Sequence, residues 1–262
     1  MKTNLLLRYA STRSLQLIGN ILKIVFYLDI TLRPGKRYRI PDRWPPLLAT
    51  SKAKAIPRIV WQTNYSRDVT LSLYLNYLVN RLMAPTYEFR FCDDDECEEF
   101  ITKRQPPEVA AAYIGLQIGA ARADLWRVIV LSTYGGVYLD ADATFSWPPE
   151  YFLSSDQSEL FAREPDGRLT NYFLAAAAGH PMLMEIAAKI VENIQANEIA
   201  SVYDMTGPTV VNELAGRASV RIAPSRSVCR QGQLTKKVFQ YPDRLKGYWA
   251  KEQLERPIVL NP

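Results

Sequence analysis

Asp140 and Asp142 are the two residues of this chain whose type and spacing best suit chemistry. They follow the apolar run 137–139 and are separated only by Ala141. In extended backbone this spacing points both carboxylates to one face. Two carboxylates at a strand end offer the hard oxygen ligands that Mg²⁺ or Mn²⁺ prefers when the ion also holds phosphate oxygens. Burying such a pair without a cation or hydrogen-bond donors would be costly. These two residues, called the acid pair below, therefore predict a divalent metal site.

Asp124 and Arg127 lie three residues apart in the helical segment that precedes the acid pair. Taken alone, such a spacing is typical of a surface ion pair worth about 0.2–0.5 kcal/mol. Just before a metal site, the same two residues become candidates to hold a polar ligand. We expect Asp124 to accept hydrogen bonds from hydroxyl groups and Arg127 to donate them.

Other polar residues give weaker signals. The four consecutive acids at 93–96 stand where a helix begins, which favours a solvated loop and cap over a second metal site. His180, the only histidine, precedes a proline and a helix, which indicates a turn residue rather than a base. No nucleotide-binding glycine loop or serine-hydrolase motif is present. Cys92, Cys97 and Cys229 match no metal-ligand spacing and are expected to be reduced thiols in a reducing compartment.

Charge is divided unevenly along the 262 residues. Residues 1–60 carry a net charge of +10, and the remaining 202 residues carry −5. A basic arm on a mildly acidic body indicates an anionic surface as the partner of the arm. Nucleic acid is not expected, because no zinc-finger, homeodomain or RNA-binding signature accompanies the charge.

Within the arm, residues 15–32 form an amphipathic pattern at helical period. The segment is too polar to span a bilayer, which needs roughly 20 mostly apolar residues, and it lacks a signal-peptide cleavage site. One alternative is a helix within residues 1–32 that lies in the cytoplasmic leaflet, peripheral on the inner face of the cell membrane, with basic neighbours at the headgroups. The other is a helix packed on the protein's own core. The one-sided charge favours the membrane. The apolar face comprises Leu17, Ile18, Ile21, Ile24, Val25 and Leu28; the basic neighbours are Arg8, Arg13, Arg33, Lys36, Arg37 and Arg39.

The body shows strands alternating with helices, which is typical of an α/β fold with a mostly parallel central sheet flanked by helices. Ligands bind such sheets beyond the carboxyl ends of the strands. We expect an amino-terminal arm and linker at 1–56 and a single catalytic domain at 57–262. Strands are predicted at 57–63, 87–92 and 137–142. Helices are predicted at 67–83, from the acids at 93–96 to about 101, and at 107–116, 117–134, 182–195 and 208–215; Gly135 and Gly136 stop the helix at 117–134.

Four segments in this order, IPRIVWQT, ARADLWRVIVLSTYGGVYLDAD, NYFLAAAAGHP and TGPTVVNE, resemble the DXD-containing sugar transferases of glycosyltransferase family 32. The resemblance covers roughly residues 57–215. It implies a GT-A fold that binds a nucleotide-sugar, with Mn²⁺ or Mg²⁺ as cofactor and retention of the anomeric configuration.

The resemblance also implies roles for individual residues. Asp140 and Asp142 would hold the metal and the donor diphosphate or ribose, and Asp124 and Arg127 the transferred sugar. Further donor-binding positions are Trp61, Gln62, Thr63 and Tyr138; the acceptor side would include Asn171, Thr206, Gly207, Pro208 and Trp249. Two departures stand out. Trp61 replaces the family's usual histidine, and the carboxy-terminal histidine motif is missing, with 246–249 as its nearest fragment, so the third metal ligand is open.

The predicted function is transfer of a hexose or N-acetylhexosamine from a UDP- or GDP-sugar to a glycan or lipid-linked acceptor, in surface polysaccharide or glycolipid synthesis. No nucleophile is evident, since Glu164 and Asp166 match no motif, and this favours attack from the leaving-group face. One alternative is a non-catalytic nucleotide-sugar-binding scaffold at the membrane. Another is a metal-dependent phosphoryl or nucleotidyl transferase, which would need the acids at 93–96 for a second metal.

Overall fold

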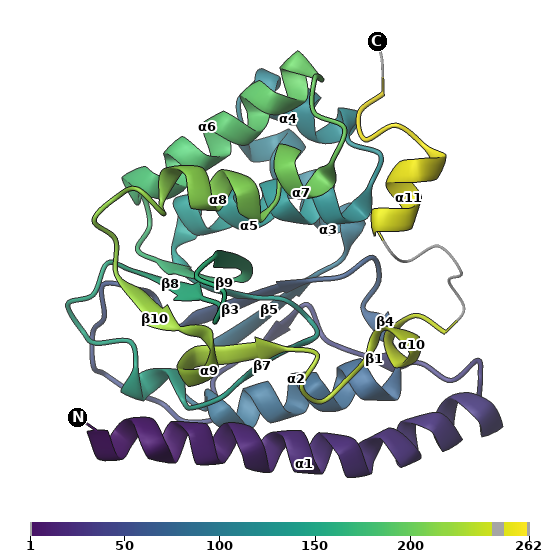
Figure 1. Ribbon diagram of the computed structural model, residues 1–262, viewed down its shortest axis with the longest axis vertical. Coiled ribbons are helices and arrows are strands. Elements are labelled where there is room, and N and C mark those ends of the chain that lie inside the picture. Colours follow the sequence, from purple (N-terminus) through teal and green to yellow (C-terminus); the bar gives the residue numbers. More distant parts are fainter. Residues whose placement is uncertain (1, 243–248, 261–262) are drawn as a thin grey trace.

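A seven-stranded sheet with helices on both faces forms the body of the protein in the computed structural model, which describes residues 2–242 and 249–260 (Figure 1). Five strands run in one direction and two are reversed. This confirms the predicted α/β fold with a mostly parallel sheet. The strand order is β10 (Ile222–Pro224), β8 (Glu159–Arg163), β9 (Leu169–Ala176), β6 (Gly136–Leu139), β3 (Ile59–Thr63), β5 (Glu88–Cys92) and β2 (Arg43–Trp44), with β9 and β2 reversed.

Two hydrophobic cores lie on opposite faces of the sheet, because neighbouring residues of a strand point to opposite faces. Trp61 and Tyr138 belong to one core, and Val60 and Val137 belong to the other. Helices α3 (Asp94–Arg104), α4 (Pro107–Gly115), α5 (Gly119–Tyr134), α6 (Pro181–Ala196), α7 (Val202–Met205) and α8 (Pro208–Leu214) cover the first core, and α2 (Leu71–Met83) covers the second. The predicted helices and strands up to residue 139 are confirmed, apart from shifts at their ends.

The double glycine between α5 and β6 is required by the backbone. Gly135 has φ +67° and caps α5 through a hydrogen bond from its N–H to the carbonyl of Leu131. A Cβ on Gly136 would lie 2.7 Å from the carbonyl oxygen of Ile59. Only glycine tolerates both the left-handed conformation and this approach. The turn therefore delivers the chain from α5 directly into the central strand that leads to the acid pair.

The acid pair itself does not lie on a strand, contrary to the prediction of a strand over 137–142. Strand β6 ends at Leu139, and Asp140 begins a turn that leads to β7 (Ala143–Phe145). The N–H of Ala143 donates to the carbonyl of Asp140 at 2.9 Å and closes this turn. The turn, rather than strand alternation, therefore brings the two carboxylates to the same side.

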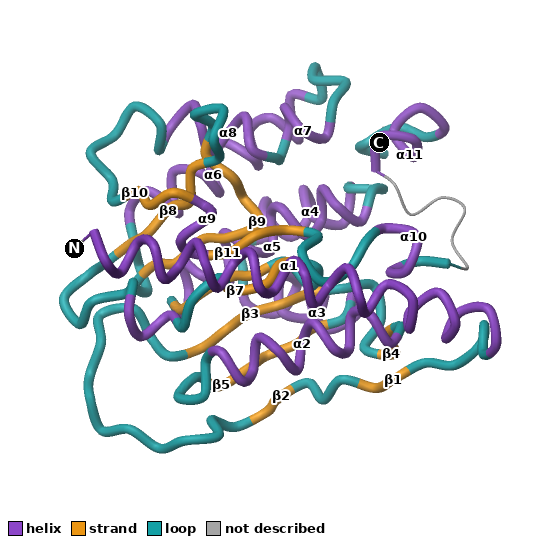
Figure 2. The backbone as a smooth tube through the Cα atoms, turned by 60° about the horizontal axis from the view of Figure 1, so that its bottom comes forward, coloured by secondary structure: helices purple, strands orange, loops and turns teal. Residues whose placement is uncertain are grey.

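The arm begins with one long helix, α1 (Lys2–Leu32), that lies along the outside of the body (Figures 1 and 2). It packs on α2, α9 (Ser225–Val228) and α10 (Lys237–Gln240). The segment 33–56, predicted to be a linker without regular structure, contains β2 and also β1 (Tyr38–Arg39), which pairs with β4 (Asp68–Val69). None of the described helices is both long enough and apolar enough to cross a bilayer.

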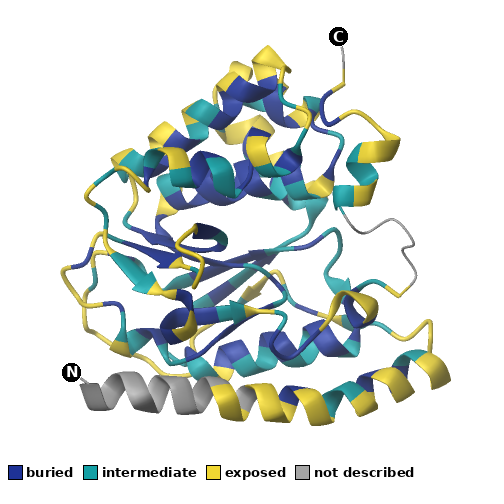
Figure 3. Ribbon diagram, in the orientation of Figure 1, coloured by how far each residue is buried: buried dark blue, intermediate teal, exposed yellow. Residues whose placement is uncertain are grey.

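The apolar stripe of α1 points away from the body. Leu17, Ile18, Ile21, Ile24, Val25 and Leu28 are all exposed, and the outer side of the helix is exposed along its described length (Figure 3). The helix packs on the body through a different face, which includes Gly19, Phe26 and Asp29. The helix does pack on the body, as the second alternative expects, but the apolar stripe is not the face that packs.

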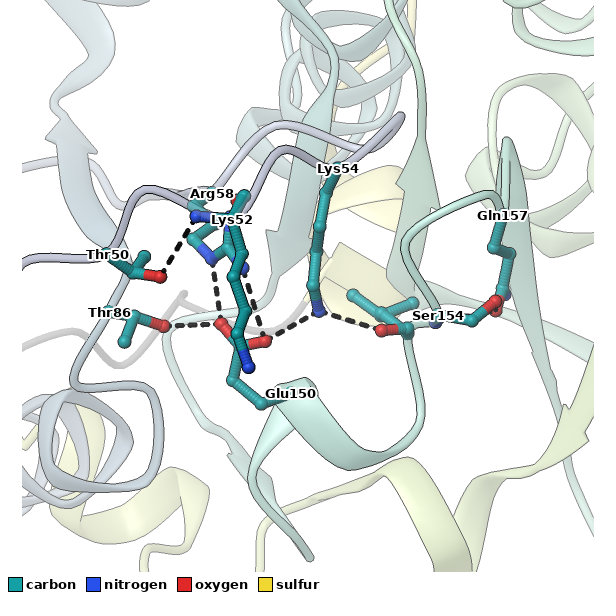
Figure 4. A network of polar contacts seen from close by, with 9 residues as sticks. Thr50, Lys52, Lys54, Arg58, Thr86, Glu150, Ser154 and Gln157 are labelled. Carbon is teal, nitrogen blue, oxygen red and sulfur yellow. Dashed lines mark hydrogen bonds and ion pairs between the residues drawn. The ribbon is translucent and has the colours of Figure 1, made fainter.

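A polar network ties the segment before β3 to the short helix that follows β7 and to the turn before β5 (Figure 4). Glu150, in η1 (Pro149–Tyr151), accepts hydrogen bonds from Thr86 and from Arg58 and pairs with Lys54 at 2.8 Å. Burial opposes the charge of Glu150, but these donors outweigh burial and lower its pKa to about 2. We call Glu150, Lys54, Arg58 and Thr86 the Glu150 network.

Candidate active site

The acid pair is held by side chains from distant parts of the chain. One oxygen of Asp140 accepts a hydrogen bond from the Tyr138 hydroxyl at 2.7 Å and lies 3.3 Å from Arg127, and the other accepts from Gln231 at 3.1 Å. Asp142 accepts from the Gln240 amide at 3.2 Å. Burial and the neighbouring charge of Asp140 raise the pKa of Asp142 to about 6. Asp140 and Asp142 therefore place two negative charges close together, and a bound cation would relieve their repulsion.

Arg127 is buried, and four acceptors fix its guanidinium, one of which is Asp140. Its guanidinium donates to the carbonyls of Asn171 at 2.7 Å and Ala123 at 3.1 Å. It also pairs with Asp124 at 2.9 Å and lies over the ring of Tyr138, 4.5 Å from the centroid. Because backbone acceptors hold this side chain, its orientation is set before any ligand binds.

Asp124 completes this buried group. It accepts hydrogen bonds from the Asn171 amide at 2.8 Å and the Thr206 hydroxyl at 3.0 Å. Burial raises the pKa of Asp124 to about 7, although Arg127 and these donors act in the opposite direction. The side chains of Asp124 and Arg127 are only 8% and 6% exposed. They form a buried ion pair beside Asp140 and not a surface ion pair.

Two cavities meet at Arg127 and Asp140. The first has a volume of about 330 Å³ and is also lined by Asp124 and Asn171. The second has a volume of about 490 Å³ and is lined by both members of the acid pair. Trp249 and Gln231 line both cavities. A ligand in one cavity would therefore meet a ligand in the other beside Asp140 and Arg127.

Most of the predicted site residues lie at these cavities. Thr63 and Tyr138 line the second, and Asn171 and Pro208 line the first. Trp249, the first residue of α11 (Trp249–Glu255), stacks on Tyr203 with ring centroids 6.4 Å apart. The remainder of its predicted fragment, 246–248, lies outside the described residues.

Thr206 and Gly207 contribute indirectly. Thr206 reaches the site only through its hydrogen bond to Asp124. Gly207 permits the chain to pass close to Tyr203, whose carbonyl oxygen would lie 2.8 Å from a Cβ at this position. Both residues shape the wall of the first cavity without lining it.

Trp61 and Gln62, expected at the nucleotide base, lie in the interior instead. Trp61 is 5% exposed, stacks on Tyr134 and donates to the carbonyl of Gly135 at 2.9 Å. Gln62 is fully buried beneath Asp140, whose carbonyl its amide approaches at 3.4 Å. The reason is that β3 is a central strand covered on both faces, so only its last residue, Thr63, reaches the cavity.

The site residues that the sequence did not reveal come from one segment, residues 229–241, which we call the strap. It supplies Gln231 and Gln240 to the acid pair, and Lys237 and Tyr241 also line the second cavity. Its first residues form β11 (Cys229–Gln231), which pairs with β7 just after the acid pair. These residues lie 90 or more positions downstream of Asp140 and carry no motif, so no sequence signal pointed to them.

The donor set fits a divalent cation. The acid pair offers hard oxygen ligands in a turn at the wall of the larger cavity, as Mg²⁺ and Mn²⁺ prefer. Among residues 2–242 and 249–260, no group of three or more His, Cys, Asp or Glu side chains gathers at one point. The acid pair would provide two carboxylates, and other coordination positions would be open to ligand oxygens and water.

Asp93, Glu96 and His180 make structural contacts, whereas Asp94 lines the second cavity. Asp93 and Glu96 form a reciprocal capping box at the start of α3, as expected of a cap. His180 precedes α6 and lies 3.3 Å from Glu159, outside both cavities. The three cysteines are free thiols.

Comparisons with known proteins agree with this geometry. Residues 60–159 match the family described as the glycosyltransferase sugar-binding region containing the DXD motif. The chain is 25% identical over 199 residues to the initiation-specific alpha-1,6-mannosyltransferase of Candida albicans, which covers 63% of this chain and 52% of that protein. It is 24% identical over 155 residues to inositol phosphoceramide mannosyltransferase 3 of Schizosaccharomyces pombe, covering 58% and 42% of the two chains. The chain thus spans about half the length of the curated relatives it matches.

Among solved structures, the PaToxG glycosyltransferase superposes with a TM-score of 0.51 at 18% identity, over 82% of both chains. A structural similarity at such low sequence identity supports the fold alone. The fold is of the GT-A type, as predicted.

Proposed function

Because the chain belongs to the DXD-containing sugar transferases of the family 32 type, we propose that it transfers a hexose or N-acetylhexosamine from a UDP- or GDP-sugar to a glycan or lipid-linked acceptor. The reaction depends on Mn²⁺ or Mg²⁺ and retains the anomeric configuration. The proposal rests on one observation above all. The acid pair, Arg127 and Asp124 stand at the junction of two cavities, which suits a donor in one and an acceptor in the other.

The nucleoside diphosphate fits the second cavity. A divalent ion held by the acid pair would supply positive charge for the leaving diphosphate. Lys237 lines the same cavity and adds a cation from the strap. Thr63 and Tyr241 provide hydroxyl groups for the rest of the nucleotide.

The transferred sugar fits beside Arg127 and Asp124. Both side chains are pinned by Asn171 and by neighbouring backbone, so they orient the sugar at little further entropic cost. Trp249 and Tyr203 form an aromatic wall at the first cavity against which an acceptor sugar can pack. This arrangement brings the acceptor hydroxyl to the anomeric carbon and limits the access of water.

Retention follows most simply from attack on the leaving-group face. Glu164 lines the first cavity together with Asp124 and Asp140, but it accepts a hydrogen bond from the buried Tyr172 hydroxyl. Asp166 pairs with Arg168 at 2.6 Å and lies outside the cavity. Same-face attack predicts that Glu164→Gln keeps a measurable transfer rate with retained configuration, whereas a covalent mechanism predicts that transfer stops.

Mannose and a lipid acceptor are the first substrates to test. The yeast relatives are named for mannosyl transfer, and one is named for a phosphoceramide acceptor. We place the reaction at the cytoplasmic side of the cell membrane, in surface polysaccharide or glycolipid synthesis, with peripheral contact through residues 1–32. The net charge of +10 over residues 1–60 supports this contact.

The test is release of nucleoside diphosphate from a panel of UDP- and GDP-sugars with Mn²⁺, with and without acceptor glycolipids. Donor turnover that depends on the metal and rises with acceptor supports the proposal. Donor binding without turnover under every condition would instead identify a scaffold. Release of pyrophosphate or nucleoside monophosphate would identify phosphoryl or nucleotidyl transfer.

A further inference from the structure

Helix α1 presents a continuous apolar surface to solvent. Seven aliphatic residues between positions 17 and 32 are 45% or more exposed: Leu17, Ile18, Ile21, Ile24, Val25, Leu28 and Leu32. At 100° per residue they lie on one side of the helix. Their side runs for about 22 Å at 1.5 Å per residue. We call it the outward face.

The opposite side of α1 joins the helix to the body. Gly19 is buried against the strap, where an added Cβ would lie 2.5 Å from the carbonyl oxygen of Gln233. Phe26 is 1% exposed and contacts Phe239 of the strap, with ring centroids 6.0 Å apart. These tight contacts fix the rotation of α1 about its axis. The apolar side is therefore held outward by the fold, and its exposure is not a result of a loosely placed helix.

The charges around the outward face favour an anionic lipid surface as its occupant. Between residues 13 and 39 the sequence holds six basic residues and a single acid, Asp29. Asp29 is buried and paired with Arg33, so the exposed charge in this stretch is positive. Two copies of such a surface would bring like charges together, whereas acidic headgroups would pair with them.

We propose that α1 binds in the plane of an anionic leaflet, inserting its outward face among the acyl chains and holding the body through its inward face. This deepens the membrane contact proposed above by naming the face that inserts and the segment that holds the body to it, and it does not depend on sugar transfer. The strap contacts α1 at Gln233 and Phe239 and the acid pair at Gln231 and Gln240. Docking therefore holds the acid pair at a fixed orientation to the lipid, as a lipid-linked acceptor requires.

The proposal is tested by flotation of the full chain with vesicles of phosphatidylcholine, with and without phosphatidylglycerol. The triple variant Ile21→Gln, Ile24→Gln, Leu28→Gln removes the centre of the outward face. The matched control, Leu82→Gln, Ile114→Gln, Met184→Gln, changes three exposed apolar residues on α2, α4 and α6. We expect wild type and control to float with anionic vesicles. The affinity of the first variant for these vesicles should be lower by about tenfold or more. Added salt should weaken wild-type binding.

Vesicle binding by the triple variant equal to that of wild type would overturn the proposal. The proposal would also be overturned if the wild-type protein does not bind vesicles and is a dimer in solution while the triple variant is a monomer. The outward face would then join two copies of the chain. All variants should keep the wild-type melting temperature, which shows that the body is intact. Because flotation needs no donor, failure of sugar transfer would leave this result unaffected, and failure to float would leave the transfer proposal standing.

Discussion

Two groups of carboxylates in this protein have opposite electrostatics. In the Glu150 network, one carboxylate meets two cations and a hydroxyl, and the pKa of Glu150 falls to about 2. In the site, the acids outnumber the cations, and the pKa values of Asp124 and Asp142 rise to about 7 and about 6. Both groups are built from residues that meet across the fold, but they differ in depth. The side chain of Asp124 is 8% exposed and that of Glu150 is 28% exposed, and burial is the main cause of the raised pKa values in the site.

The other part of the difference lies in the charges that surround each carboxylate. Glu150 is satisfied by the protein itself, and its ion pairs hold the segment 50–58 to η1. Asp142 receives neutral side-chain amides, from Gln240 and Gln231, and faces the negative charge of Asp140. A satisfied cluster contributes stability, whereas a cluster short of positive charge is suited to binding a cationic partner. Four substitutions test this distinction, ordered from the largest expected effect to the smallest.

The largest effect is expected for Asp142→Asn. It removes one metal-ligand charge without changing volume, so transfer should fall by about 10²-fold or more. The melting temperature should stay the same or rise, because the substitution also removes repulsion from Asp140. Metal-dependent nucleotide release and thermal unfolding measure the two effects. Activity within a few-fold of wild type would refute the metal assignment.

Arg127→Lys should reduce turnover by about 10–10²-fold, because a point donor cannot replace the planar fork that meets Asn171, Asp124 and Asp140. Binding of free UDP or GDP, measured by calorimetry, should be largely retained, since Arg127 is assigned to the sugar. Arg104→Lys, in the last turn of α3, is the control and should match wild type. An equal loss of nucleotide affinity would place Arg127 at the phosphates instead.

Glu150→Gln should lower the free energy of unfolding by about 1–2 kcal/mol, a value discounted because the carboxylate is partly in solvent. The sign with pH follows from the lowered pKa. An unfolded glutamate titrates near pH 4.3 and the folded one near 2, so the stabilisation is complete above about pH 4.3 and is lost as pH falls toward 2.

Urea unfolding at several pH values checks this expectation. The gap between wild type and Glu150→Gln should be widest near neutral pH and close in acid, with nucleotide release unchanged. Glu185→Gln, exposed on α6, is the matched control and should show no gap. A gap that is constant down to pH 2 would mean that the charge of Glu150 does not provide the stability.

The smallest effect is expected for Asp94→Asn. Asp94 stands in the first turn of α3 and lines the second cavity. Its loss should remove a helix-dipole contribution of about 0.3–1 kcal/mol and leave transfer within about two-fold of wild type. If transfer is abolished instead, a second acidic position takes part in the chemistry. The two-metal alternative would then gain support.

The amino-acid sequence by itself determined the parts of this protein whose interactions are local. The periodicity of α5, the glycine stop and the acid pair lie within 24 residues, so hydrophobic pattern and turn chemistry were enough to place Asp124, Arg127, Asp140 and Asp142 together. The helix cap at 93–96 and the amphipathic helix of the arm could be predicted for the same reason, because both depend on residues close together in the sequence.

Only the tertiary structure decided which distant segments meet. Trp61 became a core residue because β3 acquired neighbours on both sides, and no pattern within β3 reveals that. The strap reached the acid pair through pairing of β11 with β7, which depends on register between segments more than 80 residues apart. The outward face of α1 was likewise set by contacts at Gly19 and Phe26 with the strap. Amphipathicity defines a helix face, but the partner that buries the other face decides where it points.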